Sequence, residues 1–264
     1  LTKLEEKGFV FSPIAEPAVL ARRIRLDMLG LPPTPEQIQS FAQDKRPDAG
    51  EILVEEMLAS PHYGERWGRH WLDVAGYADS EGRTTTDAPR AWAYRYRDYV
   101  VQSFNANMPF DRFLHEQLAG DELAGLKQGD WTPEQIRLLT ATGFLRMAAD
   151  GTGSGDNSEE ARNFVIADTL QIVSTSLLGL TVACAQCHDH RYDPISHTDY
   201  FALRAVFEPS LNAKDWKIPA QRDVSLYTQA NRDEAARIEA EAQVVLKEKT
   251  EKLTKYLADA LEQE

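Results

Sequence analysis

Repeated helix start and stop signals constrain the fold of this chain more than any other feature. Two segments, Thr34-Pro35-Glu36-Gln37 and Thr132-Pro133-Glu134-Gln135, each combine a capping threonine, a proline suited to the first helical turn and a glutamine that completes a capping box. Apolar residues then recur every three or four positions, which is the period of an amphipathic helix, and the sequence holds no convincing run of alternating strand residues. We therefore expect a mostly α fold, an irregular multi-helix domain with long loops.

The same signals predict where the helices lie. The helix that starts near Met108 is expected to end at the glycine Gly120, and residues 121–130 to form a loop. The expected helices cover about 16–29, a segment that begins at Thr34, then 49–59, 61–79, 89–105, 108–120, 132–147, 158–178, 196–207 and 229–262.

One of these helices carries a run of large apolar residues at helical spacing. The spacing predicts a single aromatic stripe along the segment 61–79, and such a stripe is more typical of core packing than of a cofactor wall. Its members are Tyr63, Trp67, Trp71, Val74 and Ala78.

Changes in composition along the chain predict four parts. Residues 1–15 are a lead-in, 16–210 form a helical domain that contains both cysteines, 211–228 form a linker, and 229–264 form a long charged helix that leads to a further domain. Its leucines form only a narrow apolar seam, which favours packing on a partner: Leu246, Leu253, Leu257 and Leu261.

Both cysteines of the chain lie in one short motif, Cys184-Ala185-Gln186-Cys187-His188, here called the CxxCH motif. This spacing is typical of covalent haem c attachment, because two thiols three residues apart can add to the two vinyl groups of one haem. The histidine that follows then supplies the proximal axial ligand to the iron. We therefore predict covalent haem c, anchored by Cys184 and Cys187 and ligated by His188, in a module that transfers electrons.

Other interpretations of the motif stay open. A redox dithiol has the same spacing, and so has a plain disulfide between Cys184 and Cys187 in a non-catalytic helical scaffold. Zinc with His188 or His190 fits less well, because zinc sites use four ligands in two separated pairs. A catalytic domain is a further alternative, in which a haem or a metal acts on an extracellular substrate such as a polysaccharide.

Polar residues crowd directly after the motif. Asp189, His190 and Asp193 are candidate ligands for a divalent cation, or partners that orient His188. Arg191 is a candidate partner for a haem propionate, because its guanidinium donates two parallel hydrogen bonds. An equally weighted alternative is a capped turn that Asp193 helps to close.

The sixth haem ligand has several candidates elsewhere in the chain. We favour His70, because its predicted helix is rich in aromatic residues that suit the wall of a haem pocket. The alternative for His70 is a hydrogen-bonded core histidine. Further candidates for the sixth ligand are His115, His197, Met108 and Met147.

A second acidic set lies in and after a glycine-rich loop. Clusters of oxygen ligands suit hard cations such as calcium, although the spacing of an EF-hand is absent. The alternative is that these acids stabilise the positive N-terminal end of the next helix. The set comprises Asp150, Asp156, Asn157, Glu159 and Glu160.

Charge and hydropathy limit the partners and the compartment. With a formal net charge of −13, the chain is poorly suited to nucleic acid or to an anionic membrane surface. No run of about 18 apolar residues is present, so no transmembrane segment is expected. The first residues are polar and show no signal peptide, and the chain reads as a piece of a longer product. Haem c is normally attached outside the cytoplasm, so the haem interpretation implies a periplasmic or otherwise exported protein with an upstream export signal.

A series of local motifs resembles one known family, the planctomycete cytochrome c-type domain family. It is most similar to the domain of unknown function that lies between the short amino-terminal cytochrome domain and a large carboxy-terminal domain. The resemblance covers about residues 15–210 and departs at Arg191, where lysine is expected, and at Gly76, where arginine is usual. The motifs begin Arg25-Leu26-Asp27-Met28-Leu29-Gly30, Ser60-Pro61-His62-Tyr63-Gly64-Glu65-Arg66-Trp67-Gly68, Glu116-Gln117-Leu118-Ala119-Gly120-Asp121 and Cys184-Ala185-Gln186-Cys187-His188-Asp189-His190.

The resemblance implies an exported bacterial protein of several domains with a redox role, and it implies no specific reaction. On this basis the expected partners are a redox protein or adjoining domains of the same polypeptide.

Overall fold

The computed structural model describes residues 2–83, 87–125, 129–155 and 157–261, and the fold of these residues is built from helices. Within these ranges the β-structure is limited to an isolated bridge between Ser80 and Pro89. The prediction of a mostly α fold with a long C-terminal helix is therefore confirmed. No described helix is long and apolar enough to cross a membrane.

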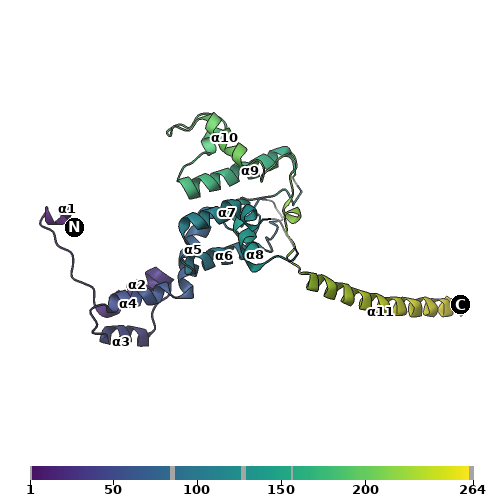
Figure 1. Cartoon of the computed structure of the whole chain (residues 1–264), viewed down its shortest axis with the longest axis horizontal. Helices are drawn as coiled ribbons and strands as arrows, with labels where there is room; N and C mark the ends of the chain where they lie inside the picture. The colour runs from purple at the N-terminus through teal and green to yellow at the C-terminus, as the bar shows by residue number, and fades with distance from the viewer. Residues whose placement is uncertain (1, 84–86, 126–128, 156, 262–264) are drawn as a thin grey trace.

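The first group of helices forms a small layer of its own (Figure 1). It contains α2 (Pro17–Leu29), α3 (Pro35–Gln43) and α4 (Ala49–Leu58), preceded by the short α1 (Thr2–Glu5) at the end of an extended segment. The predicted capping box at Thr34 is formed, with the Thr34 hydroxyl accepting from the Gln37 N–H. The buried residues of this layer are Ala21, Leu29, Leu53 and Met57.

The central group provides the largest core. It contains α5 (Pro61–Ala75), α6 (Ala93–Asn105), α7 (Phe110–Ala124), α8 (Pro133–Ala141) and the 3-10 turn η1 (Thr142–Arg146). Aromatic rings dominate the buried cluster, which includes Trp71, Tyr96, Tyr99, Phe113 and Phe144.

Two glycines let pairs of these helices approach backbone to backbone. A Cβ atom at Gly64 would lie 2.3 Å from the Val101 carbonyl oxygen on α6, and one at Gly120 would lie 2.2 Å from the Leu138 carbonyl oxygen on α8. The backbone of α7 is not helical at Ala119 (φ −138°, ψ 26°), so the helix is kinked next to the predicted stop at Gly120. The chain resumes as helix after this kink, and the prediction of a loop from residue 121 was wrong. The helix α7 continues to Ala124 and ends at Gly125, whose φ of 68° suits glycine.

The predicted aromatic stripe on α5 is wrong for three of its five members. Trp71 is buried, but Trp67 is 37 % exposed, Val74 is 50 % exposed, and Ala78 lies beyond the end of the helix. The buried face instead follows two glycines, and it comprises Gly64, Gly68, Trp71, Leu72 and Ala75. A search for large apolar residues misses this face because three of its five members are small, and the two glycines lie against α6.

The third group carries the CxxCH motif. It contains α9 (Glu159–Val173), the π turn η2 (Ser174–Leu178), the 3-10 turn η3 (Ala183–Gln186) and α10 (His197–Phe207). In Figure 1 α9 and α10 form a layer beside the central group. Their shared core consists of Ile166, Leu170, Val182, Ala185, Tyr200 and Leu211.

The segment 211–228, which includes the short turn η4 (Pro219–Gln221), packs on the loop that precedes α9. The Trp216 indole N–H donates to the Thr152 hydroxyl at 3.0 Å, and the Arg222 guanidinium lies 2.6 Å from the buried Asp150 carboxylate. The last helix, α11 (Gln229–Leu261), follows this segment and extends away from the three groups (Figure 1).

Candidate functional site around the CxxCH motif

The two cysteines lie on an exposed turn whose other residues pack into the protein. Ala185 and Val182 are buried in the core that α9 and α10 share, whereas Cys184 and Cys187 are exposed free thiols. The Cys187 N–H donates to the Cys184 carbonyl at 3.4 Å, which closes the 3-10 turn. From α9, the Gln171 side chain accepts the Ala183 N–H at 3.0 Å. The turn is therefore fixed by apolar and backbone contacts that leave both thiols accessible.

His188 is exposed and is oriented by one backbone contact. Its Nδ1 lies 2.7 Å from the Asp189 carbonyl oxygen. A carbonyl oxygen can only accept, so this contact assigns the proton to Nδ1 and leaves the lone pair of a neutral ring on Nε2. A metal-bound imidazole commonly has this arrangement, with the second nitrogen donating to a carbonyl.

His190 closes the loop that follows. Its side chain is only 6 % exposed, and its Nδ1 accepts the Asp193 N–H at 2.9 Å and the Tyr192 N–H at 3.4 Å. The other ring nitrogen lies 3.5 Å from the Thr181 hydroxyl. Because one nitrogen accepts from the loop backbone and the other lies beside Thr181, which precedes the CxxCH turn, the geometry gives His190 a structural role.

Asp189 joins the loop to α10. Its carboxylate accepts the His197 N–H at 2.8 Å, and the His197 Nε2 in turn lies 3.1 Å from the Gln186 carbonyl oxygen. At the start of α10, Ser196 forms a capping box with Asp199. These contacts connect the end of the CxxCH turn to the beginning of the helix.

Asp193 and Arg191 lie on the outside of the loop. The Asp193 carboxylate is 46 % exposed and lies 3.2 Å from the His190 Nδ1. The guanidinium of Arg191 lies over the Tyr192 ring, 5.5 Å from its centre, and Tyr192 is 83 % exposed. Among the residues that the structure describes, no group of three or more His, Cys, Asp or Glu side chains is arranged to hold a metal ion.

His70 lies on the exposed side of α5, where its ring is 5.4 Å from that of Trp67. The helix α5 packs mainly on α6 and α2, while η3 packs mainly on α10 and α9. The role of His70 as a sixth ligand therefore stays a prediction. His115 is exposed on α7, and Met147 is buried in the central core.

The second acidic set is not assembled as one cluster. Asp150 is buried and accepts from the Thr152 N–H and hydroxyl, in addition to its ion pair with Arg222. Glu159 and Glu160 lie in the first turn of α9, where negative charge is favourable. Asp156 lies outside the described residues.

Sequence reasoning missed two residues that support the motif. Gln171 supports the turn from α9, and Tyr200 lies beneath it on α10, with 1 % of its surface exposed. The Tyr200 hydroxyl has no hydrogen-bond partner among the described residues, and burial raises its pKa. The position of Tyr200, four residues after the Ser196 cap, indicates an inward-facing residue, but nothing in the sequence marks Gln171.

The described part of the chain is thus a helical domain that presents a CxxCH motif on an exposed turn. Residues 1–212 match the family PSCyt2, described as a protein of unknown function (DUF1549). The match covers well over half of the chain, so the chain belongs to this planctomycete cytochrome domain-associated family, as its motifs indicated. Comparison with curated proteins and with solved structures gives no match.

Proposed function

We propose that this chain is an exported c-type haem-binding module that transfers electrons within a larger redox protein. The observation that carries the proposal is the combination, on one anchored turn, of two exposed thiols and an exposed imidazole whose Nδ1 lies against a backbone carbonyl. A bound haem would supply a one-electron couple.

The residues of the turn fit this group in their chemistry. Cys184 and Cys187 would form the two thioether bonds, and the outward Nε2 of His188 would ligate the iron. The Asp189 carbonyl would keep the imidazole in the tautomer required for ligation. The exposed guanidinium of Arg191 is available to pair with a propionate.

The loop beyond the motif supports the turn rather than competing for the haem. The His190 Nδ1 and one carboxylate oxygen of Asp189 accept backbone N–H groups of the loop and of α10. This arrangement favours haem over a metal site that uses His190, Asp189 and Asp193 together.

Covalent attachment is tested by the mass of the protein purified from its native source, or from cells that export it and contain a haem-attachment system. We expect an added mass of one haem and an absorption spectrum that survives acid-acetone extraction. Either Cys184→Ser or Cys187→Ser reduces covalent attachment, and His188→Ala keeps attachment but changes the spectrum of the iron. The matched control is Tyr192→Ala, a neighbouring exposed residue that the proposal does not use.

A protein from its native source without the mass of haem contradicts the proposal. If that protein lacks only two hydrogens, Cys184 and Cys187 form a disulfide, and the scaffold alternative is supported instead. Cytoplasmic expression is no test, because haem c attachment normally takes place after export. Localisation outside the cytoplasm is a further requirement of the proposal, and fractionation of the native cells measures it.

A further inference from the structure

The helix α11 is exposed on every side. All described side chains from Gln229 to Ala258 are exposed, and Figure 1 shows the helix projecting from the rest of the described chain. Its first turn is held by Asp130, which accepts the Gln229 N–H at 2.8 Å and lies 3.3 Å from the Arg232 guanidinium. The exposed surface includes large apolar residues, such as Leu246 at 58 % and Leu253 at 58 %.

Six apolar residues and one threonine of α11 form one continuous line along the helix, here called the α11 seam, while Val244, Val245 and Tyr256 lie off this line. Their spacing averages about 3.7 residues, close to the period of the helix itself, so the line stays on one face instead of winding around it. The α11 seam consists of Ala235, Ile238, Ala242, Leu246, Thr250, Leu253 and Leu257.

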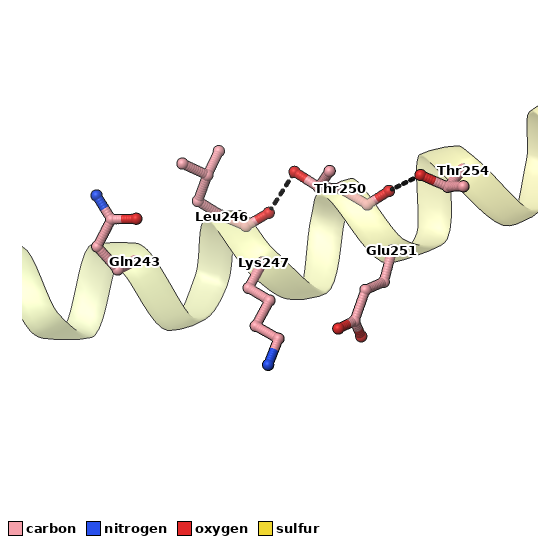
Figure 2. Close-up of a pocket in the computed structure, with 6 residues that line it drawn as sticks. All are labelled: Gln243, Leu246, Lys247, Thr250, Glu251 and Thr254. Carbon is pink, nitrogen blue, oxygen red and sulfur yellow. Dashed lines mark hydrogen bonds between the residues drawn. The ribbon is translucent and has the colours of Figure 1, made fainter.

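Figure 2 shows part of this face. Leu246 and Thr250 lie on one side of the helix, and Lys247 and Glu251 extend from the opposite side. The Thr250 hydroxyl donates to the Leu246 carbonyl at 2.8 Å, so its polar atom is satisfied within the helix. Thr250 can therefore be covered by another helix without leaving an unpaired hydroxyl.

Charge is segregated along the helix. Residues 233–241, the acidic block, have a net charge of −3, with Asp233, Glu234, Glu239 and Glu241 against Arg237. Residues 247–255, the basic block, have a net charge of +2, with Lys247, Lys249, Lys252 and Lys255 against Glu248 and Glu251.

This segregation of charge favours a second copy of α11 as the partner that covers the α11 seam, and it favours one orientation of that copy. Two copies of α11 in parallel would place like blocks side by side, which repel. In antiparallel orientation, with a two-fold axis near Val244, the acidic block of each copy lies beside the basic block of the other, and the two α11 seams cover each other. We propose that α11 pairs with α11 of a second copy of this chain in antiparallel orientation.

Self-association of the full chain tests the pairing. Sedimentation over a range of concentrations should show a monomer–dimer equilibrium, and Leu246→Asp should weaken it by about tenfold or more, because a charge would replace an apolar seam residue. The matched control is Val244→Asp, which adds the same charge two residues away at a site of similar exposure, 60 % against 58 %, on the opposite side of the helix. It should leave the dissociation constant within about twofold of wild type.

A chain that stays monomeric at every concentration overturns the proposal. This holds also if the α11 seam then proves to bind another protein or another segment of the same polypeptide. Equal weakening by Leu246→Asp and Val244→Asp also overturns it. Circular dichroism of each variant reports whether the helix itself is retained.

Orientation is tested by exchanging the charges of the two blocks. The variant Asp233→Lys, Glu239→Lys, Lys249→Glu, Lys252→Glu reverses the sign of both blocks and leaves the contacts of Arg237 with Glu234 and Glu241 in place. The blocks of this variant carry +1 and −2, so in antiparallel pairs it still associates with itself, although more weakly than wild type, and does not mix with wild type. Preferential mixing of the two proteins indicates parallel pairs and overturns the proposed orientation. Haem content plays no part in these measurements.

Discussion

The central helical group and the CxxCH loop use polar side chains in opposite ways. In the centre, Glu116 is 1 % exposed and receives hydrogen bonds from Tyr99, Arg112 and Arg137, so that charged groups join α6, α7 and α8 to one another. In the loop, residues 187–196, the polar side chains contact the nearby backbone, and His188 and the two thiols of the motif stay exposed. Removal of a polar side chain should therefore reduce the free energy of unfolding more in the central group than in the loop.

The largest expected effect comes from Gly120→Ala. The new Cβ atom would lie 2.2 Å from the Leu138 carbonyl oxygen, so α7 and α8 must separate. We expect a loss of about 3 kcal/mol or more in the free energy of unfolding, measured by urea denaturation. The control is Gly50→Ala, at a helical glycine with no atom near its Cβ position, which should cause no loss.

The variant Glu116→Gln should have the next largest effect, a loss of about 2–4 kcal/mol in the free energy of unfolding at neutral pH. It removes the negative charge that Arg112 and Arg137 both contact. Burial alone would raise the pKa of Glu116, but hydrogen bonds from Arg137, Arg112 and Tyr99 outweigh it and hold this pKa below its usual value. A depressed pKa in the folded state means that the unfolded state binds more protons as the pH falls.

The stabilisation from Glu116 is thus present above its unfolded pKa, about 4.3, and is lost as the pH falls toward the lower folded value. The free energy of unfolding, measured by urea denaturation, should decrease less between neutral pH and about pH 4 in Glu116→Gln than in wild type. The same substitution at the exposed Glu122 on α7 should leave the pH dependence unchanged. An unaltered pH dependence in Glu116→Gln would show that the acid sensitivity of the fold arises elsewhere.

A smaller effect is expected for His190→Ala, about 1–2 kcal/mol, because two backbone N–H groups lose their acceptor in the loop. Amide hydrogen exchange should increase at Tyr192 and Asp193 and stay unchanged in α7. The matched variant His188→Ala removes an exposed imidazole and should leave the stability of the haem-free protein within about 0.5 kcal/mol. If the two variants destabilise the protein equally, His190 does not close the loop as described.

The smallest effect should come from Asp189→Ala, about 1 kcal/mol, since the lost acceptor serves one N–H at the start of α10. Thermal unfolding of the haem-free protein measures this loss, and Arg191→Ala, at an exposed position two residues further along, should have no measurable effect. A loss at Asp189 as large as that at Glu116 would remove the contrast between the two regions.

The features that were predictable from sequence are those that depend on neighbours within a few residues. The capping boxes at Thr34 and Thr132 are formed as expected, because a hydroxyl and an amide three residues apart meet whatever the rest of the chain does. The family is likewise recognisable from local motifs, and the match over residues 1–212 confirms it.

The role of each polar residue after the motif was not predictable in this way. Asp189, His190 and Asp193 have the composition of a cation site, yet Asp189 contacts a helix eight residues away and His190 is enclosed within the loop. Composition places these side chains in one segment but does not say which of their atoms the backbone already uses. That depends on how the loop meets α10.

The sequence by itself determined the helical class, most helix starts, the family and the thiol and imidazole set of the CxxCH motif. Only the tertiary structure decided that α7 resumes after the kink at Ala119 and packs on α8 through Gly120, that the buried face of α5 follows Gly64 and Gly68, and that His190 supports the loop while His188 is exposed. The physical reason is range: caps and spacing are local, whereas a close approach between backbones, or the burial of one of two nearby histidines, is set by elements that meet only in the folded chain.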